Sequence, residues 1–207
     1  MTRATRVYDE SSLVARLAPL DRQRKTAFAA ACAQRLFPLF ERYARTAGDL
    51  ATSQRLAEIL ETVWLCASGS AADISSMGAE AESMVPPDDD RWTFESGYAQ
   101  NAAAAAAYAI RTWLTNDPQE AAWTARQVYD AADYAFTQVG LEPGNIYVST
   151  FEDRTREAEA ALASGIVQTA LTAIDQDLQA VESAMPSFPD LQETSTAQGV
   201  AWAASFP

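Results

Sequence analysis

The sequence contains no histidine, and this absence excludes more functions than any residue that is present. Ser-His-Asp and Cys-His catalysis are excluded, and so is every histidine-ligated zinc or iron site. The usual di-iron helical bundle is excluded as well, because its ligands include a Glu-x-x-His motif. Any enzymatic reaction would therefore depend on carboxylates, arginine, tyrosine or the single lysine, Lys25.

Cysteine is nearly absent too, since Cys32 and Cys66 are the only two in the chain. Both lie in apolar helical surroundings, "AAACAQRLF" and "TVWLCASG", where a free cysteine behaves as a small buried hydrophobe. A reactive thiol would need a basic neighbour, and a disulfide scaffold would need more cysteines. We therefore expect two inert, reduced cysteines.

No run of apolar residues approaches the roughly 20 that a membrane span requires. The first residues, "MTRATRVYDESSL", have no apolar signal-peptide core behind their arginines. Because 48% of the residues are apolar and only 21% are charged, the chain should fold rather than stay disordered. We expect a cytoplasmic protein that does not enter a membrane.

Positive charge is scarce after the first part of the chain. Residues 1–45 carry nine Arg/Lys against four Asp/Glu, whereas residues 46–207 carry six Arg against 24 Asp/Glu. This acidic body should repel nucleic-acid phosphates and attract a protein with a basic surface. The alternative is that the charge only keeps the protein soluble. The basic cluster Arg22, Arg24 and Lys25 is most simply a solvated face, and an anion contact is its alternative.

Helical periodicity dominates the chain, and no alternating β-strand pattern of useful length occurs. Apolar residues recur every three or four positions within residues 21–48 and again within 52–67, as expected for amphipathic helices. Pro38 falls inside the first pattern and should kink the helix, because it removes a backbone donor and clashes with the preceding turn. The predicted fold class is all-α, one domain of about seven helices over residues 1–186.

Two capping motifs mark the starts of later helices. Asp117 precedes a proline at the first helical position and predicts a helix over residues 118–139. Ser149 is followed three residues later by a glutamate, the capping-box spacing, and predicts a helix over residues 150–184.

Helical periodicity is lost after Met185, so residues 187–207 are predicted as a non-helical tail. This tail carries Trp202 and Phe206, which a purely disordered segment rarely needs. Two alternatives stay open: the tail docks on the helical body, or it is disordered.

The segment "AFAAACAQRLFPLFERYA" resembles its counterpart in the YjaG-like family of small bacterial helical proteins, a domain of unknown function. The shared features are Phe28, a turn of small residues, Arg35, and then Phe37-Pro38. "LAEILETVW" is similar to that family's helix ending in tryptophan. "EAESMVPPDDDRWTFESGYAQNAAAA" is similar to its passage of glutamate, proline, acidic loop, tyrosine and small-residue helix. The resemblance implies a single α-helical domain, a loose association with bacterial signalling, and little about activity.

The stretch "SMVPPDDDRW" holds three consecutive aspartates, Asp88, Asp89 and Asp90, followed by Trp92. Adjacent loop aspartates diverge, whereas a metal needs converging oxygens, and the EF-hand spacing is absent. The Asp-Asp-x-x-Asp motif of helical prenyl-transfer enzymes is absent too, because Trp92 stands where its last aspartate belongs. We expect no metal here, and Asp89 or Asp90 should instead cap the next helix. An acidic rim beside Trp92 that contacts a partner is compatible with that interpretation.

Together these features favour a non-catalytic protein that acts by protein–protein interaction, as a regulatory or signalling accessory. One alternative is an immunity or antitoxin-like inhibitor that covers a basic toxin, and another is a carboxylate-based enzyme with a divalent ion. We assign no catalytic residue, metal ligand or cofactor. Since tryptophan is enriched among interface hot spots, the candidate partner contacts are Asp88, Asp89, Asp90, Trp92 and Trp202.

Overall fold

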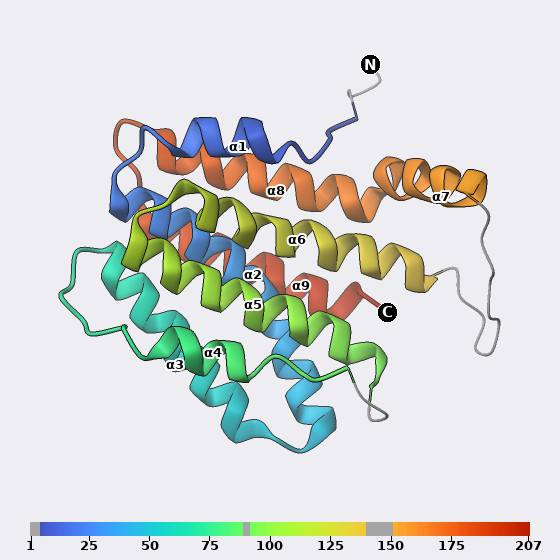
Figure 1. Ribbon diagram of the computed structural model, residues 1–207, viewed down its shortest axis with the longest axis horizontal. Helices are drawn as coiled ribbons and strands as arrows, with labels where there is room; N and C mark the ends of the chain where they lie inside the picture. The colour runs from blue at the N-terminus through green and yellow to red at the C-terminus, as the bar shows by residue number, and fades with distance from the viewer. Residues whose placement is uncertain (1–4, 89–91, 140–150) are drawn as a thin grey trace.

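The computed structural model describes residues 5–88, 92–139 and 151–207. Within these ranges the regular structure is entirely α-helical, which confirms the predicted fold class, although there are nine helices rather than about seven (Figure 1). None of the described helices combines the length and apolar character that crossing a bilayer takes. The helices are α1 (Glu10–Leu17), α2 (Arg22–Ala47), α3 (Leu50–Ala67), α4 (Met77–Ser83), α5 (Phe94–Thr115), α6 (Pro118–Val139), α7 (Phe151–Ala163), α8 (Gly165–Glu182) and α9 (Phe188–Ser205).

Helix α2 lies at the centre of the bundle, where it contacts α3, α5, α6, α8 and α9. Most of its side chains between Lys25 and Phe40 are buried, as expected for a helix that other helices surround. Its most extensive partner is α5, which runs beside it in Figure 1 and whose buried residues are mainly alanines. These small side chains allow the two helices to approach closely, because the distance between packed helices depends on the side chains at the contact.

Pro38 lies inside α2, and the helix continues past it to Ala47. In Figure 1 the last turns of α2 run in a different direction from its first turns. A change of direction is expected where proline removes a backbone donor.

Two aspartates begin helices, and a glycine ends one. The Asp9 carboxylate accepts the backbone N–H of Ser12 at 3.0 Å, and Asp21 accepts that of Arg24 at 2.9 Å. Gly48 ends α2 with a φ of 74°, a left-handed conformation that glycine adopts without a steric penalty.

Of the basic cluster at the start of α2, Arg22 is exposed as predicted, whereas Arg24 and Lys25 do not belong to a solvated face. Arg24 donates to the carbonyl of Ser183 at the end of α8, at 3.0 Å, and Lys25 donates to the carbonyl of Asn116 at the end of α5, at 2.8 Å. Positive side chains are favourable at helix C-termini, where carbonyl groups lack partners. Burial lowers the pKa of Lys25. These contacts join the start of α2 to the ends of two other helices.

Residues 150–184 do not form the single helix that we predicted, because the chain breaks at Ser164 into α7 and α8. The Ser164 hydroxyl accepts the backbone N–H of Val167 at 3.2 Å and thereby caps α8. The Ser-Gly pair at this position was the signal for a new helix start.

The prediction of a non-helical C-terminal tail is wrong. Residues Phe188–Ser205 form α9, which Ser187 caps and which packs along α2. A Cβ atom on Gly199 would lie 2.5 Å from the carbonyl oxygen of Arg35, so a larger residue would push the two helices apart. Of the two alternatives, docking on the helical body is the one observed.

Helices α2 and α3 share a core, as their amphipathic patterns indicated. Phe28, Leu36, Phe40 and Trp64 are buried, whereas Phe37 is only half-buried.

Both cysteines are free and buried. Burial raises the pKa of the Cys32 thiol and that of the Cys66 thiol. This disfavours the reactive thiolate, in agreement with the expectation that neither thiol is activated.

Phe28→Ala is expected to lower the free energy of unfolding by about 3–5 kcal/mol, because it empties a fully buried aromatic site. Leu50→Ala is the control, since Leu50 is largely exposed and its truncation should change stability by about 0.5 kcal/mol or less. Urea unfolding followed by circular dichroism measures both. A loss below about 1 kcal/mol for Phe28→Ala would contradict its place in the core.

Candidate functional site

The predicted acidic contact is only partly within the described residues. Asp88 is exposed, and Trp92 is 37% exposed. Asp89 and Asp90 lie outside the described residues. We had predicted that one of them caps the following helix, but the N-cap of α5 is Thr93.

Trp202 is a core residue, which corrects its interpretation as an exposed partner anchor. Its side chain is only 6% exposed, and its ring stacks on that of Phe206 with centroids 5.2 Å apart. The guanidinium of Arg35 lies 5.9 Å from the Trp202 ring, within the range of a cation–π contact. Trp202 therefore packs on its own domain, which was the alternative interpretation.

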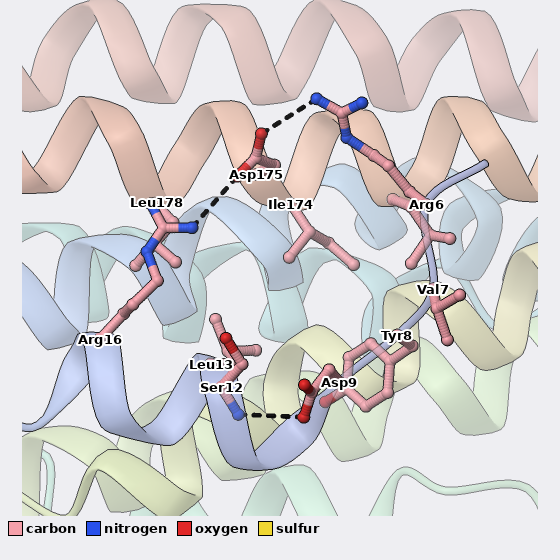
Figure 2. A pocket seen from close by; sticks show the side chains of 11 residues that line it. Arg6, Val7, Tyr8, Asp9, Ser12, Leu13, Arg16, Ile174, Asp175 and Leu178 are labelled. Carbon is pink, nitrogen blue, oxygen red and sulfur yellow. Dashed lines mark hydrogen bonds and ion pairs between the residues drawn. The ribbon is translucent and has the colours of Figure 1, made fainter. Parts of the chain in front are cut away.

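A hollow of about 230 Å³ lies between α1, α8 and the extended residues that precede α1 (Figure 2). We call it the α1–α8 hollow. Buried aliphatic side chains from both helices form its floor, and polar side chains form its rim. An apolar surface with a few converging polar groups is typical of a binding site. The floor consists of Leu13, Leu171, Ile174 and Leu178, and the rim of Arg6, Tyr8, Asp9, Ser12, Arg16 and Asp175.

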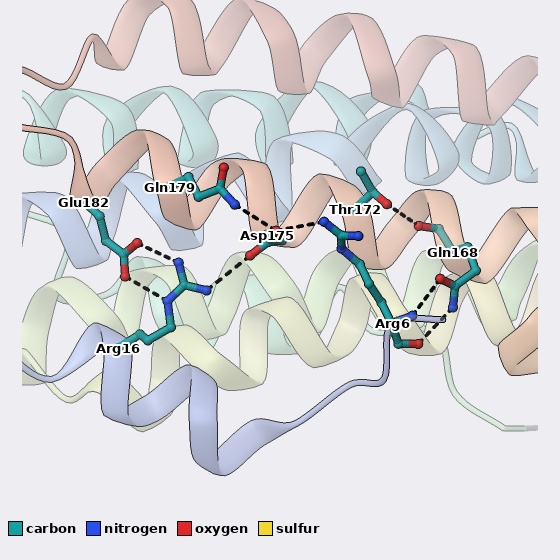
Figure 3. A network of polar contacts seen from close by, with 7 residues as sticks. All are labelled: Arg6, Arg16, Gln168, Thr172, Asp175, Gln179 and Glu182. Atoms are coloured by element: carbon teal, nitrogen blue, oxygen red, sulfur yellow. Dashed lines mark hydrogen bonds and ion pairs between the residues drawn. The ribbon is translucent and has the colours of Figure 1, made fainter. Parts of the chain in front are cut away.

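Asp175 of α8 joins the two arginines of the rim (Figure 3). Its Oδ2 accepts a hydrogen bond from Arg6 at 3.1 Å and its Oδ1 accepts one from Arg16 at 3.2 Å. Arg16 also donates to both carboxylate oxygens of Glu182, at 2.9 and 2.6 Å. Although burial alone would raise it, the hydrogen bonds from the two arginines lower the pKa of Asp175. The charged side chains of the rim are thus paired with one another, and these ion pairs keep them in position.

Residues 5–9 form an extended segment that lies against α8 (Figure 1). We call it the N-terminal strap. The side-chain amide of Gln168 pairs with the backbone of Arg6: its Oε1 accepts the N–H, and its Nε2 donates to the carbonyl, each at 2.9 Å (Figure 3). Two such bonds fix an extended backbone in the same way as a neighbouring β-strand would.

Tyr8 anchors the other end of the strap on α6. Its ring stacks on Tyr129 with centroids 5.4 Å apart, and its hydroxyl donates to the carbonyl of Ala122 at 2.8 Å. The guanidinium of Arg126 lies 5.5 Å from the centres of both rings. Burial, and then the nearby Glu10 carboxylate, raises the pKa of Tyr8, so its hydroxyl stays a neutral donor.

Neither Asp175 nor Tyr8 has a pKa that is shifted toward neutrality. A general acid or base works best when its pKa lies near the operating pH, whereas the pKa of Asp175 is lowered and that of Tyr8 is raised, both away from neutrality. Over the ranges that the structure describes, no three cysteine, aspartate or glutamate side chains gather in a way that could hold a metal ion.

A buried ion pair fixes α8 beneath the hollow. Arg35 of α2 donates to both oxygens of Asp177 of α8, at 2.7 and 2.9 Å, and the two side chains are 0% and 3% exposed. The Arg35 Nε also donates to Gln198 of α9, at 2.8 Å. One guanidinium therefore ties three helices together and sets where the next α8 side chains, including Asp175, emerge.

Neither the hollow nor the strap was predicted from the sequence. Asp175 and Glu182 stand seven residues apart, so they share a helical face. That spacing was the available signal. Which side chains cover this face of α8 depends on tertiary packing. Arg6 lies 169 residues before Asp175 and Arg16 lies 166 residues before Glu182, so the sequence pattern does not bring them together.

Comparison with known proteins shows similarity to one family of unknown function. A family model described as a protein of unknown function (DUF416) matches residues 12–142, which extend from α1 to just beyond α6. The crystal structure of a DUF416 family protein from Shewanella baltica OS155 is similar at a TM-score of 0.69 and 14% sequence identity, covering 91% of this chain and 93% of that one. At this identity the likeness shows the fold alone. A search of the curated proteins gives no match.

Asp175→Asn is expected to lower stability at neutral pH, because the arginines hold the pKa of Asp175 below the ordinary value of 3.8. The stabilisation is present above that ordinary value and is lost as the pH falls through the lower pKa of the folded state. The difference in unfolding free energy between wild type and variant should therefore shrink below about pH 4. Urea unfolding across the acidic range measures it, with exposed Asp88→Asn as the control. A difference that stays constant down to about pH 2 would contradict the network.

Proposed function

The chain belongs to the DUF416 family of proteins of unknown function, and on that premise we propose that it is a non-catalytic protein that binds another protein at the α1–α8 hollow. The finer resemblance, to YjaG-like proteins, and a cytoplasmic location are part of the same proposal. A regulatory or signalling accessory is the role that such a protein would serve.

The proposal rests on the composition of the α1–α8 hollow. Its floor is apolar, and its rim is a network in which Asp175 and Glu182 already compensate Arg6 and Arg16. Protein-binding surfaces commonly have an apolar centre and a polar rim. Because Asp175 and Glu182 already bind guanidinium groups, a basic side chain of a partner can pair with such a carboxylate in the same way, so that binding leaves no rim carboxylate unpaired.

The charge of the chain supports a partner with a basic surface. The net charge is −13, and the excess of acidic residues lies after residue 45. Such a field steers a basic partner toward the protein and weakens with rising salt. The immunity-protein and carboxylate-enzyme alternatives have no observation of their own in their favour and stay predictions.

Ser12→Trp tests the hollow without removing a core side chain. Ser12 is an exposed rim residue, and the backbone N–H that it donates to Asp9 is kept in the variant. A tryptophan at this position should fill the hollow and reduce capture of a partner by about tenfold, which corresponds to about 1.4 kcal/mol of binding energy.

The matched control is Ser11→Trp, which places the same side chain one residue away, on an exposed position that does not line the hollow. Full-length wild type and both variants are immobilised, and proteins from the native host are captured at low and at moderate salt and quantified by mass spectrometry. We expect a basic protein retained by wild type and Ser11→Trp and lost with Ser12→Trp. Equal recovery by the two variants, or no salt-sensitive protein, would contradict the proposal.

A further inference from the structure

The N-terminal strap reaches from α8 to α6 and borders open space on the surface. Three separate hollows have strap residues in their walls. One of about 440 Å³ includes Thr5 and Arg6, the α1–α8 hollow of about 230 Å³ includes Arg6 to Asp9, and one of about 350 Å³ includes Val7 and Tyr8. We call this surface the strap trough; its walls are Gln168 and Asp175 of α8 and Ala122, Arg126 and Tyr129 of α6.

The strap occupies the trough as an extended peptide would. Exposure alternates along it: Arg6 and Tyr8 are half-buried, whereas Val7 is 66% exposed. Alternation with a period of two is the property of an extended chain, whose successive side chains point to opposite sides. Extended peptides are recognised through backbone hydrogen bonds, with pockets for alternate side chains.

Both parts of that recognition are present. Gln168 pairs with the N–H and the carbonyl of Arg6, contacts that any residue except proline could supply. Asp175 binds the guanidinium of Arg6, and Tyr129 stacks on the ring of Tyr8. Backbone contacts give general affinity, and the two side-chain contacts select a basic residue followed, two positions later, by an aromatic one.

The strap is held by a small set of specific contacts, chiefly those of Arg6 and Tyr8. The strap belongs to no regular helix or strand, and the Arg6 side chain is 32% exposed. Polar contacts attach it to α6 and α8. Segments with few buried apolar contacts open at lower free energy than the core does. Release of Arg6 and Tyr8 would break these contacts without breaking a helix.

From this geometry we infer that the strap trough is a binding site for an extended segment of a partner protein, with the pattern basic residue–any residue–aromatic residue, and that residues 5–9 are its intramolecular occupant. The inference rests on the proposed function, because it names how the partner would be recognised. A basic partner segment also complements Asp175 and the acidic character of the chain. The attached strap competes at an effective concentration on the order of millimolar, so it limits binding to partners that outcompete it.

A labelled peptide tests the trough directly. The probe is fluorescein-labelled RATRVYDE, the sequence of residues 3–10, and fluorescence anisotropy measures its binding to full-length protein. Because the strap competes, the Arg6→Ala/Tyr8→Ala variant should bind the probe at least about tenfold more tightly than wild type does. A probe with glutamate in place of the second arginine and alanine in place of tyrosine should not bind.

The trough itself is tested by adding Gln168→Ala to the strap variant, which should weaken probe binding about tenfold. Adding Gln54→Ala, at an exposed position of α3, should not weaken it. Circular dichroism confirms folding, and if the double strap variant does not fold, the single variant Tyr8→Ala takes its place. Absence of probe binding to the folded strap variant, equal binding of the altered probe, or no effect of Gln168→Ala would each overturn the inference.

The two proposals fail separately. If a partner depends on Ser12 but the probe does not bind, the trough is wrong and the proposed function stands. If the probe binds as expected but no partner is captured, the trough stands and the choice of partner site is wrong.

Discussion

The buried ion pair between Arg35 and Asp177 is the constraint on which the other features depend. It lies where α2, α8 and α9 meet, with both side chains almost fully buried. Removing two charges from water is costly, so a pair of this kind adds little net stability compared with apolar residues of similar size. Losing one partner, however, leaves an unpaired buried charge. The pair therefore selects one arrangement of the three helices more than it strengthens the fold.

That arrangement determines what α8 presents to solvent. Asp177 faces inward to Arg35, so Asp175, two residues earlier, points to the other side and receives Arg6 and Arg16. Gln168, two turns before Asp175 on the same helix, holds the strap backbone. One face of α8 thus completes the core while the other carries the rim of the α1–α8 hollow and a wall of the strap trough. The binding surface follows from how the helix is fixed, and the acidic charge of the chain suits a basic segment arriving there.

The sequence predicted the helices whose apolar stripes or caps were complete. Asp21 and Gly48 marked α2 correctly, and residues 118–139 matched α6. Helix α9 was missed because its buried side carries Ser195 and Gly199 between Leu191 and Trp202, so the usual hydrophobic period is interrupted. The candidate site was missed for a different reason. Its two arginines and its acidic partners stand at opposite ends of the chain, and only packing brings them together. Trp202 was misjudged because an aromatic residue near a chain end can equally be a core anchor.

The measurement that tests this account most directly is a double-mutant cycle at the buried pair. Arg35→Met, Asp177→Leu and the combined variant are compared with wild type by urea unfolding. Each single variant should lose about 3–5 kcal/mol of unfolding free energy, because it leaves one buried charge unpaired. The combined variant should lose much less than their sum, which would show strong coupling between the two residues. Additive losses would mean that Arg35 and Asp177 act independently, and the pair would then not be what holds α8 in place.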